Sequence, residues 1–433
     1  MRIPRVAAVV AALCVATAGA VGQQVSERKD IAVFALSYAR WGIPSGALAL
    51  VDEQTKEVFI NLGRFNVLGM SYRLEESSID EFIQKIREVK EQNVEIPETV
   101  RLGQEAFTEA DFNRLVGSFI VVIPTVTFYE SRRNENGDFR VDLKTSYTFV
   151  NVEKAETIDH FEISTTGSGE SLQRAISAAA EGIAPKLQYE LRGIPEFQLR
   201  TGIIDVSRGN VLLEFGRNMG VQRGDEYAIT ETRILPSGHE VTDEIGLLVV
   251  KDVDQEISYA KIIYSSRRPQ VGDQLEEIPR LGFDTNAYVH TIFGVQDQQL
   301  AVSGAIGVRQ STSRGFYNLR PFIGIEVPFG ITSSLGLAGL TANLYGGGEL
   351  NWYLWRFQLV PAAAIGLAGA IPLRETDSFS VSHVGGFVQM TGSLLLTRDF
   401  RVAVDLGYAA WFGLGAGESY AGLVAGIGAT LKY

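Results

Sequence analysis

The chain has 433 residues, of which 45% are hydrophobic, with a mean hydropathy of +0.07 and a formal net charge of −12. This length exceeds one ordinary domain, so we expect two or three. An acidic chain without a long lysine or arginine cluster is not a typical nucleic-acid binder, and we predict no nucleic-acid partner.

Residues 1–22 are predicted to be a secretory signal. Met1 to Arg5 is short and basic, Val6 to Val15 is apolar, and Ala18-Gly19-Ala20 has the small-x-small pattern of a cleavage site. The apolar run is too short for a transmembrane helix. Removal of two arginines with the signal would change the net charge from −12 to −14.

Cys14 is the sole cysteine and lies inside this segment, so the mature chain would carry no thiol. Disulfides and cysteine-based metal sites are therefore excluded from the prediction. A lipid anchor at Cys14 would need a small residue before it, and Leu13 stands there. We expect an unmodified signal, and lipidation of Cys14 stays open as the alternative.

Residues 23–198 are predicted to form a periplasmic α/β (α+β) domain. Apolar periodicity gives helices at residues 47–62, 77–91 and 171–191, the last of them long and continuous. Predicted strands cover residues 31–36, 63–68, 119–126, 139–152 and 161–166.

This order, with the sequence NLGRFNVLGM after the first helix, resembles the curli assembly/transport family. There a strand, a helix and a GRF-x-V strand open the periplasmic domain, and a strand pair and a helix close it. Residues 150–163 and 171–191 occupy the closing positions, so the similarity covers about 170 residues. The lipobox cysteine and a recognisable channel-forming insertion are missing. Oligomeric secretion-channel activity is therefore not carried over.

Residues 199–280 are predicted to form a small SH3-like all-β domain. Five short strands are expected at residues 202–206, 210–215, 226–233, 245–253 and 258–264. The turns Gly220-Val221-Gln222-Arg223-Gly224-Asp225 and Val271-Gly272-Asp273 resemble the C-terminal module of the flagellar assembly T-type protein. We interpret their glycines as turn residues that need positive φ, without a chemical role.

Residues 281–433 are predicted to form an eight-stranded antiparallel transmembrane β-barrel. From Phe283 onward charged residues become rarer, and long segments such as Gly422 to Tyr433 alternate apolar with small or polar residues. In a soluble sandwich the apolar face would be the core, whereas in an outer-membrane barrel it contacts lipid. Strands of a dozen residues, a glycine-rich polar face and aromatic residues near strand ends favour the barrel.

The predicted strands cover residues 283–295, 299–311, 316–329, 337–354, 356–373, 379–397, 400–413 and 419–433. An even number closes the sheet and leaves no free edge in hydrocarbon. The tight turns near residues 355–356 and 397–399 suit the periplasmic side, and longer connections near 330–336, 374–378 and 413–418 suit the outside. Tyr433 after an alternating strand resembles the C-terminal sorting signal of outer-membrane barrels.

Six charged residues are predicted to face the lumen and to form ion pairs there: Arg309, Arg320, Glu326, Glu349, Arg401 and Asp405. So few strands leave little free space, so a closed barrel used as an anchor is favoured. A solute-conducting pore is the alternative.

No catalytic set emerges from the sequence, and we predict neither an enzyme nor a cofactor or metal site. The four histidines, His160, His239, His290 and His383, have no metal-ligand spacing, and no serine stands in a G-x-S-x-G motif. Residues 167–170 (GSGE) lack the lysine and Ser/Thr of a phosphate-binding loop.

The sequence therefore predicts an outer-membrane anchor whose periplasmic modules dock envelope or flagellar components, with membrane lipid and envelope proteins as partners. A small pore or secretion-channel component is the alternative function, and a surface adhesin is disfavoured by short outer loops.

Overall fold

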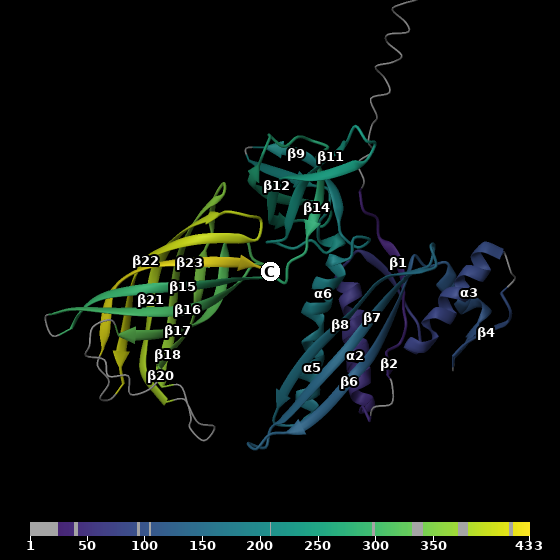
Figure 1. Ribbon diagram of the computed structural model, residues 1–433, viewed down its shortest axis with the longest axis horizontal. Helices are drawn as coiled ribbons and strands as arrows, with labels where there is room; N and C mark the ends of the chain where they lie inside the picture. Colours follow the sequence, from purple (N-terminus) through teal and green to yellow (C-terminus); the bar gives the residue numbers. More distant parts are fainter. Residues whose placement is uncertain are drawn as a thin grey trace, which may run out of the picture.

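The computed structural model describes residues 25–38, 42–92, 96–103, 105–207, 209–296, 299–330, 341–370, 380–414 and 419–433. The predicted signal and Cys14 lie outside these ranges, as do most of the longer barrel loops. Three folded units follow one another along the chain (Figure 1). No helix among the described residues is long and apolar enough to cross a membrane.

The first unit is built on a mixed sheet. Its strand order is β3 (Phe65–Gly69), β1 (Lys29–Val33), β6 (Ile120–Arg133), β7 (Phe139–Asn151) and β8 (Glu156–Gly169), and the short β2 (Ser37–Tyr38) also pairs with β6. β1 runs parallel to β3 and β6, whereas β6, β7 and β8 are antiparallel. β7 and β8 are therefore a long hairpin that ends at a free edge.

Helices cover both faces of this sheet. α2 (Ser45–Asn61), α5 (Leu172–Glu181) and α6 (Ile183–Gly193) share one apolar core with the strands, in which Phe59 and Leu187 pack with Val122 and Phe149. On the other face, a second core joins Phe82, Phe107 and others. Its elements are η1 (Glu76–Ser78), α3 (Ile79–Gln92), the hairpin of β4 (Thr99–Leu102) and β5 (Glu105–Thr108), and α4 (Glu109–Val116).

The single helix predicted at residues 171–191 is wrong, because the chain breaks at Gly182 into α5 and α6. Pro185 explains the break. In a continuous helix it would lack the N–H that bonds the carbonyl of Glu181 and would clash with that carbonyl. In the first turn of a new helix, no such bond is needed. The β4–β5 hairpin was also missed, since its strands have only four residues each.

The second unit is a closed six-stranded barrel with strand order β10-β13-β12-β11-β14-β9. Its strands are β9 (Arg200–Ser207), β10 (Asn210–Leu213), β11 (Glu226–Ile234), β12 (Glu240–Val253), β13 (Ser258–Ser265) and β14 (Gln274–Ile278), with η2 (Arg217–Met219) after β10. The sequence predicted five of these strands. The sixth, β14, follows Val271-Gly272-Asp273 and closes the sheet by pairing with both β9 and β11.

The third unit is a closed antiparallel barrel of eight strands, one of them interrupted at Asn351. In chain order they are β15 (Phe283–Gln296), β16 (Gln299–Thr312), β17 (Leu319–Gly330), β18 (Thr341–Leu350) with β19 (Trp352–Leu354), β20 (Phe357–Ala370), β21 (Ser380–Leu395), β22 (Phe400–Gly413) and β23 (Tyr420–Lys432). The eight predicted strands are confirmed. β15 pairs with β23, so the chain enters and leaves the barrel at the same end.

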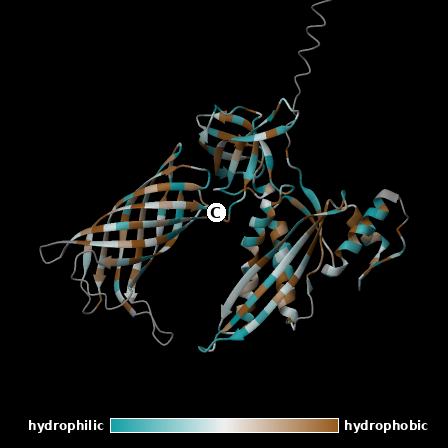
Figure 2. Ribbon diagram, viewed as in Figure 1, coloured by the Kyte–Doolittle hydropathy of each residue, from teal (hydrophilic) through white to brown (hydrophobic). Residues whose placement is uncertain are grey.

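This barrel has the reverse of a soluble protein's polarity. Its large exposed side chains are apolar and come from every strand, including Ile306, Ile323, Ile365, Val404 and Ile427. Brown hydrophobic positions alternate with paler ones along the barrel strands in Figure 2. About half of the buried side chains of the same strands are polar or charged, and the others are aromatic, alanine or other apolar residues. The period-2 pattern thus separates an apolar outside from an interior that holds the buried charges.

Candidate functional site: the lumen and the joint beneath it

All six residues predicted to face the lumen are buried inside the eight-stranded barrel: Arg309, Arg320, Glu326, Glu349, Arg401 and Asp405. Only one pair forms within this set, between Arg309 and Glu349 at 3.7 Å. The other charges bond to inward residues that the sequence analysis did not single out as their partners.

Arg320 Nη1 lies 2.9 Å from Asp284 and its Nη2 donates to Tyr353 Oη at 2.7 Å. His290 lies between two carboxylates, with Nε2 3.3 Å from Asp405 and Nδ1 3.7 Å from Glu326.

The Arg401 guanidinium donates to the side-chain oxygen of Gln358, on β20. Each of these lumen charges therefore has at least one polar partner, as buried charges require.

Aromatic rings fill the middle of the lumen. The hydroxyls of Tyr288 and Tyr345 are 2.5 Å apart, and Phe322 and Phe387 stack at 6.4 Å. Two inward-facing glycines make room for these rings. A Cβ on Gly307 would lie 2.4 Å from the Tyr288 ring, and one on Gly324 would lie 2.3 Å from the Tyr345 ring. Side chains therefore occupy the cross-section of the barrel.

The three units meet at the turn of residues 220–225, which we call the joint turn. Gly220 has φ +75°, and a Cβ there would lie 2.0 Å from the carbonyl oxygen of Leu62 in the first unit. Gly224 has φ +83°, and a Cβ there would lie 2.0 Å from the carbonyl oxygen of Ser313, in a turn of the eight-stranded barrel. The two glycines therefore serve close contact with both neighbours, besides the turn conformation that the sequence analysis gave them.

A buried ion network stabilises the contact between the three units, and we call this contact the joint. Arg192, from α6, has no solvent exposure and lies 2.5 Å from Glu277 and 3.1 Å from Asp225, both in the six-stranded barrel. Arg64, from the first unit, donates to Glu277 at 2.7 Å, and Arg314, from the eight-stranded barrel, donates to Asp225 at 3.0 Å. Each carboxylate is thus shared by two guanidiniums.

The electrostatic effect of these neighbours is large. Burial by itself would raise the pKa of Glu277, but the Arg64 and Arg192 guanidiniums outweigh it and hold that pKa far below its usual range. Glu226 shows the same competition, in which Lys432 and Arg280 lower its pKa to about 2 despite burial. Both carboxylates are therefore ionised at any neutral or mildly acidic pH.

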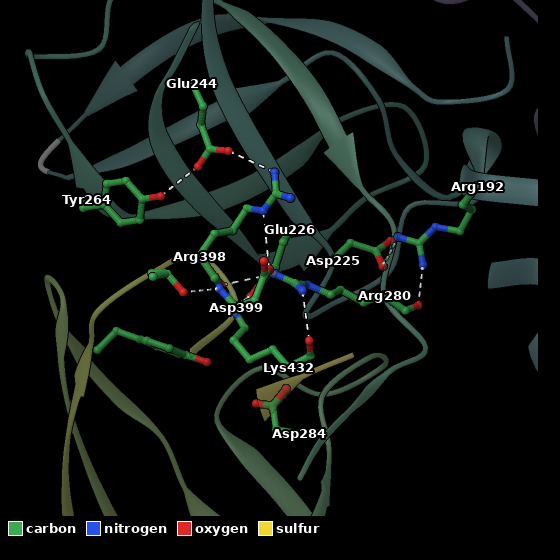
Figure 3. A network of polar contacts seen from close by, with 12 residues as sticks. Arg192, Asp225, Glu226, Glu244, Tyr264, Arg280, Asp284, Arg398, Asp399 and Lys432 are labelled. Carbon is green, nitrogen blue, oxygen red and sulfur yellow. Dashed lines mark hydrogen bonds and ion pairs between the residues drawn. The ribbon is translucent and has the colours of Figure 1, made fainter. Parts of the chain in front are cut away.

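A second group of ion pairs connects the six-stranded barrel to the end of the eight-stranded barrel (Figure 3). Glu226 binds Lys432, the penultimate residue of the chain, and lies 3.0 Å from Arg280. Arg280 also lies 2.7 Å from Asp399, in the tight turn between β21 and β22. In the same turn, Arg398 lies 3.0 Å from Glu244 of β12.

Apolar contacts complete this interface. One hydrophobic cluster contains Leu247, Ile263 and Ile278 of the six-stranded barrel together with Tyr353 and Leu395 of the eight-stranded barrel. At its margin, the Arg356 guanidinium lies 3.8 Å from the ring centroid of Tyr264. The six-stranded barrel therefore covers the end of the eight-stranded barrel at which its tight turns lie.

Sequence reasoning missed the joint because its partners are up to 213 residues apart along the chain. One signal was present: Asp225-Glu226 and Glu276-Glu277 are adjacent acidic residues at β11 and β14, so the alternation of side chains turns at least one of each pair away from water, where a charge needs a partner. Tyr433, the predicted sorting signal, follows β23, and its N–H donates to the carbonyl of Phe283 at 3.2 Å. Among the described residues, no group of acidic, histidine and cysteine side chains is arranged to hold a metal.

No protein-family model matches the chain, and no curated protein sequence matches it. Among solved structures, it is similar to Neisserial surface protein A, with 14% identity, a TM-score of 0.28, and coverage of 35% of this chain and 97% of that chain. It is also similar to outer membrane protein H of P. aeruginosa, with 15% identity, a TM-score of 0.26, and coverage of 35% and 99%.

A third similar structure is the PelC dodecamer from Paraburkholderia phytofirmans, with 12% identity, a TM-score of 0.24, and coverage of 38% of this chain and 88% of that chain.

Proposed function

We propose that this chain is an outer-membrane anchor that holds two periplasmic modules at the membrane and lets them dock envelope or flagellar components. The observation that carries the proposal is the inverted polarity of the eight-stranded barrel. In water, its ring of exposed isoleucine, leucine, valine and aromatic side chains would be an aggregation surface far larger than monomeric proteins tolerate. In hydrocarbon, the same surface is solvated and the polar interior is shielded.

The connectivity supports a single orientation. An even number of strands returns the chain to its starting end, so the first two units remain on one side of the membrane. The tight turns lie on that same side, as periplasmic turns do in outer-membrane barrels. We therefore assign residues 23–280 to the periplasm and the longer connections to the cell exterior. Tyr433 at the end of β23 is the proposed sorting signal.

The role we propose is structural, without turnover. The joint makes the periplasmic units rigid extensions of the barrel, because its buried arginines and carboxylates satisfy one another only when all three units are docked. A partner that binds the periplasmic units would thus be held at a fixed place beneath the membrane. The curli-like assignment of the first unit and the SH3-like assignment of the second belong to this proposal as the modules that dock.

A small pore is the second candidate, favoured by the closed barrel with a charged lumen. The tyrosine and phenylalanine rings across the lumen and the six-stranded barrel over one mouth both argue against it. Conduction would need the rings to rotate away and the joint to open.

Two measurements test the proposal. Cell fractionation should recover the mature chain in the outer membrane, with the mobility shift between heated and unheated gel samples that intact barrels show. Recovery of a wholly soluble chain without that shift would refute the anchor. In planar bilayers, the refolded full chain should give no steady conductance, and stable open-channel steps would favour the pore.

A further inference from the structure

β8 leaves one long edge of the first unit's sheet unpaired. It is the last strand in the order β3-β1-β6-β7-β8, and it has 14 residues, whereas the opposite edge strand, β3, has five. From Asp159 to Gly169 it pairs with β7 without any register shift. This segment contains no proline or bulge, the devices with which proteins commonly protect a sheet edge.

The direction of the free backbone groups follows from two contacts. The carbonyl of Lys144 on β7 accepts a hydrogen bond from Thr127 on β6, so Lys144 points its backbone groups away from its partner on β8, Ser164. The carbonyl of Ser164 accepts a bond at 2.6 Å from the Lys186 ammonium of α6, so it points outward. By alternation, Glu162, Thr166 and Ser168 also present their N–H and C=O groups to the edge.

The free edge of β8 is accessible to another strand, whereas the face of β8 that packs against α5 is covered. α5 lies so close to β8 that a Cβ on Gly167 would fall 2.1 Å from the carbonyl oxygen of Ala175. The four outward residues of β8, in contrast, are all exposed. Among the outward backbone groups of β8, the carbonyl of Ser164 accepts a hydrogen bond from the described side chain of Lys186. An extended segment beside β8 could therefore form a regular ladder.

The charge at one end of the edge indicates what kind of segment fits. Burial raises the pKa of Glu190 of α6, and the negative charge of Asp159, at the start of the regular β8 segment, raises it further. Neither carboxylate belongs to an ion pair among the described residues, whereas all three other acidic side chains of β7 and β8, Asp142, Glu156 and Glu162, do. The other end of the edge, Ser164 to Gly169, is uncharged.

We propose that the β8 edge is the docking surface of the periplasmic region and that its occupant is an extended segment of another envelope protein, added as a further strand. The segment carries lysine or arginine where it passes Asp159 and Glu190, and small or β-branched residues beside Ser164 to Gly169. Main-chain hydrogen bonds supply the affinity, and the acidic pair sets the direction of the strand. This inference deepens the proposed docking role and rests on it.

The test uses the full chain in living cells. The only natural cysteine is Cys14, so a Cys14→Ala, Thr166→Cys chain carries a single thiol on the edge, to which a photoreactive benzophenone maleimide is attached. We expect a crosslink to a different protein, with the crosslinked peptide containing lysine or arginine. Ser237→Cys, in an exposed hairpin turn of the six-stranded barrel, is the control and should give no such product.

Ser168→Pro, added to the Thr166→Cys chain, removes an outward N–H without removing a bond to β7 and should abolish the crosslink. Ser168→Ala keeps the N–H and should preserve it. If the proline chain does not assemble, Asp159→Asn with Glu190→Gln is the second variant, and it should reduce the crosslink several-fold.

A product that joins two copies of this chain, a crosslink that the proline leaves unchanged, or no crosslink at all would overturn the inference. Each of these results is compatible with a heat-modifiable barrel in the outer membrane, so the anchor proposal would survive. A wholly soluble chain would instead refute the anchor, whatever the crosslink.

Discussion

The Arg64 guanidinium of the first unit donates to the Glu277 carboxylate of the six-stranded barrel at 2.7 Å, and both side chains are buried. The same carboxylate also binds Arg192, so one acidic residue is the shared partner of two buried cations. A buried ion pair is often no better than a well-packed apolar pair, but removal of one member leaves uncompensated charge. The joint is therefore sensitive to loss of a single carboxylate.

Glu277→Ala should destabilise the contact between the first two units by about 3–5 kcal/mol, because it leaves two guanidiniums buried without their shared partner. The measurement is limited proteolysis of the full chain in detergent, in which residues 193–199, between the units, should become cleavable. Glu276→Ala is the matched control. Its partner Arg200 lies 3.5 Å away in an exposed pair, so the cost should be about 0–1 kcal/mol. Equal protease resistance of the two variants would contradict the structural role of Glu277.

The joint should also respond to acid in a defined range. Glu226 has a pKa of about 2 in the folded protein, below the value of about 4.3 of an unfolded glutamate, and the pKa of Glu277 is lowered as well. A lowered folded-state pKa contributes stability that is complete above about pH 4.3 and is lost as the pH falls toward 2. We expect the protease resistance of the joint to be constant from pH 7 to 5 and to decline below about pH 4. A decline that begins above pH 5 would contradict these assignments.

Gly224→Ala tests whether the joint turn requires close approach as well as a positive φ. Its matched control is Gly238→Ala, since Gly238 has φ +84° but no atom within 4 Å of the added Cβ. Both variants bear the cost of a left-handed alanine, about 1–2 kcal/mol. Only Gly224→Ala brings a methyl group 2.0 Å from a backbone oxygen of the eight-stranded barrel. We expect it to expose Arg314 to trypsin and Gly238→Ala to leave Arg314 protected. The same cleavage in both would show that φ alone matters.

The barrel was predictable from sequence because its signal is local. Each strand repeats apolar and polar residues with period 2, so Leu423, Ile427 and Leu431 could be placed on one face without knowledge of the neighbouring strands. The inward position of Arg309 and Asp405 followed in the same way. Their partners did not, since His290 of β15 reaches Asp405 of β22 over Gly426 of the strand between them.

The joint could not be predicted for a related reason. Arg192 lies in a helix whose pattern looks amphipathic and complete, and nothing near it in sequence indicates that Asp225 and Glu277 will neutralise it. Gly224 was recognised as a turn residue from its neighbours, but its contact with Ser313 depends on how two separate units dock. Local periodicity thus gave the elements, and long-range neutralisation of charge determined their assembly.

The lipid-facing assignment can be tested with two isoleucines that differ in environment and hardly in exposure. Ile365, on β20, is 80% exposed on the outside of the eight-stranded barrel, and Ile234, on β11, is 71% exposed on the six-stranded barrel. If the first contacts acyl chains and the second contacts water, Ile365→Lys should cost about 2–4 kcal/mol and Ile234→Lys should cost less than about 0.5 kcal/mol. Urea unfolding in phospholipid vesicles, followed by the heat-modifiable gel shift, measures both. Because lysine in water is harmless at either position, an equally small effect of the two substitutions would mean that the apolar surface around Ile365 is not in a membrane.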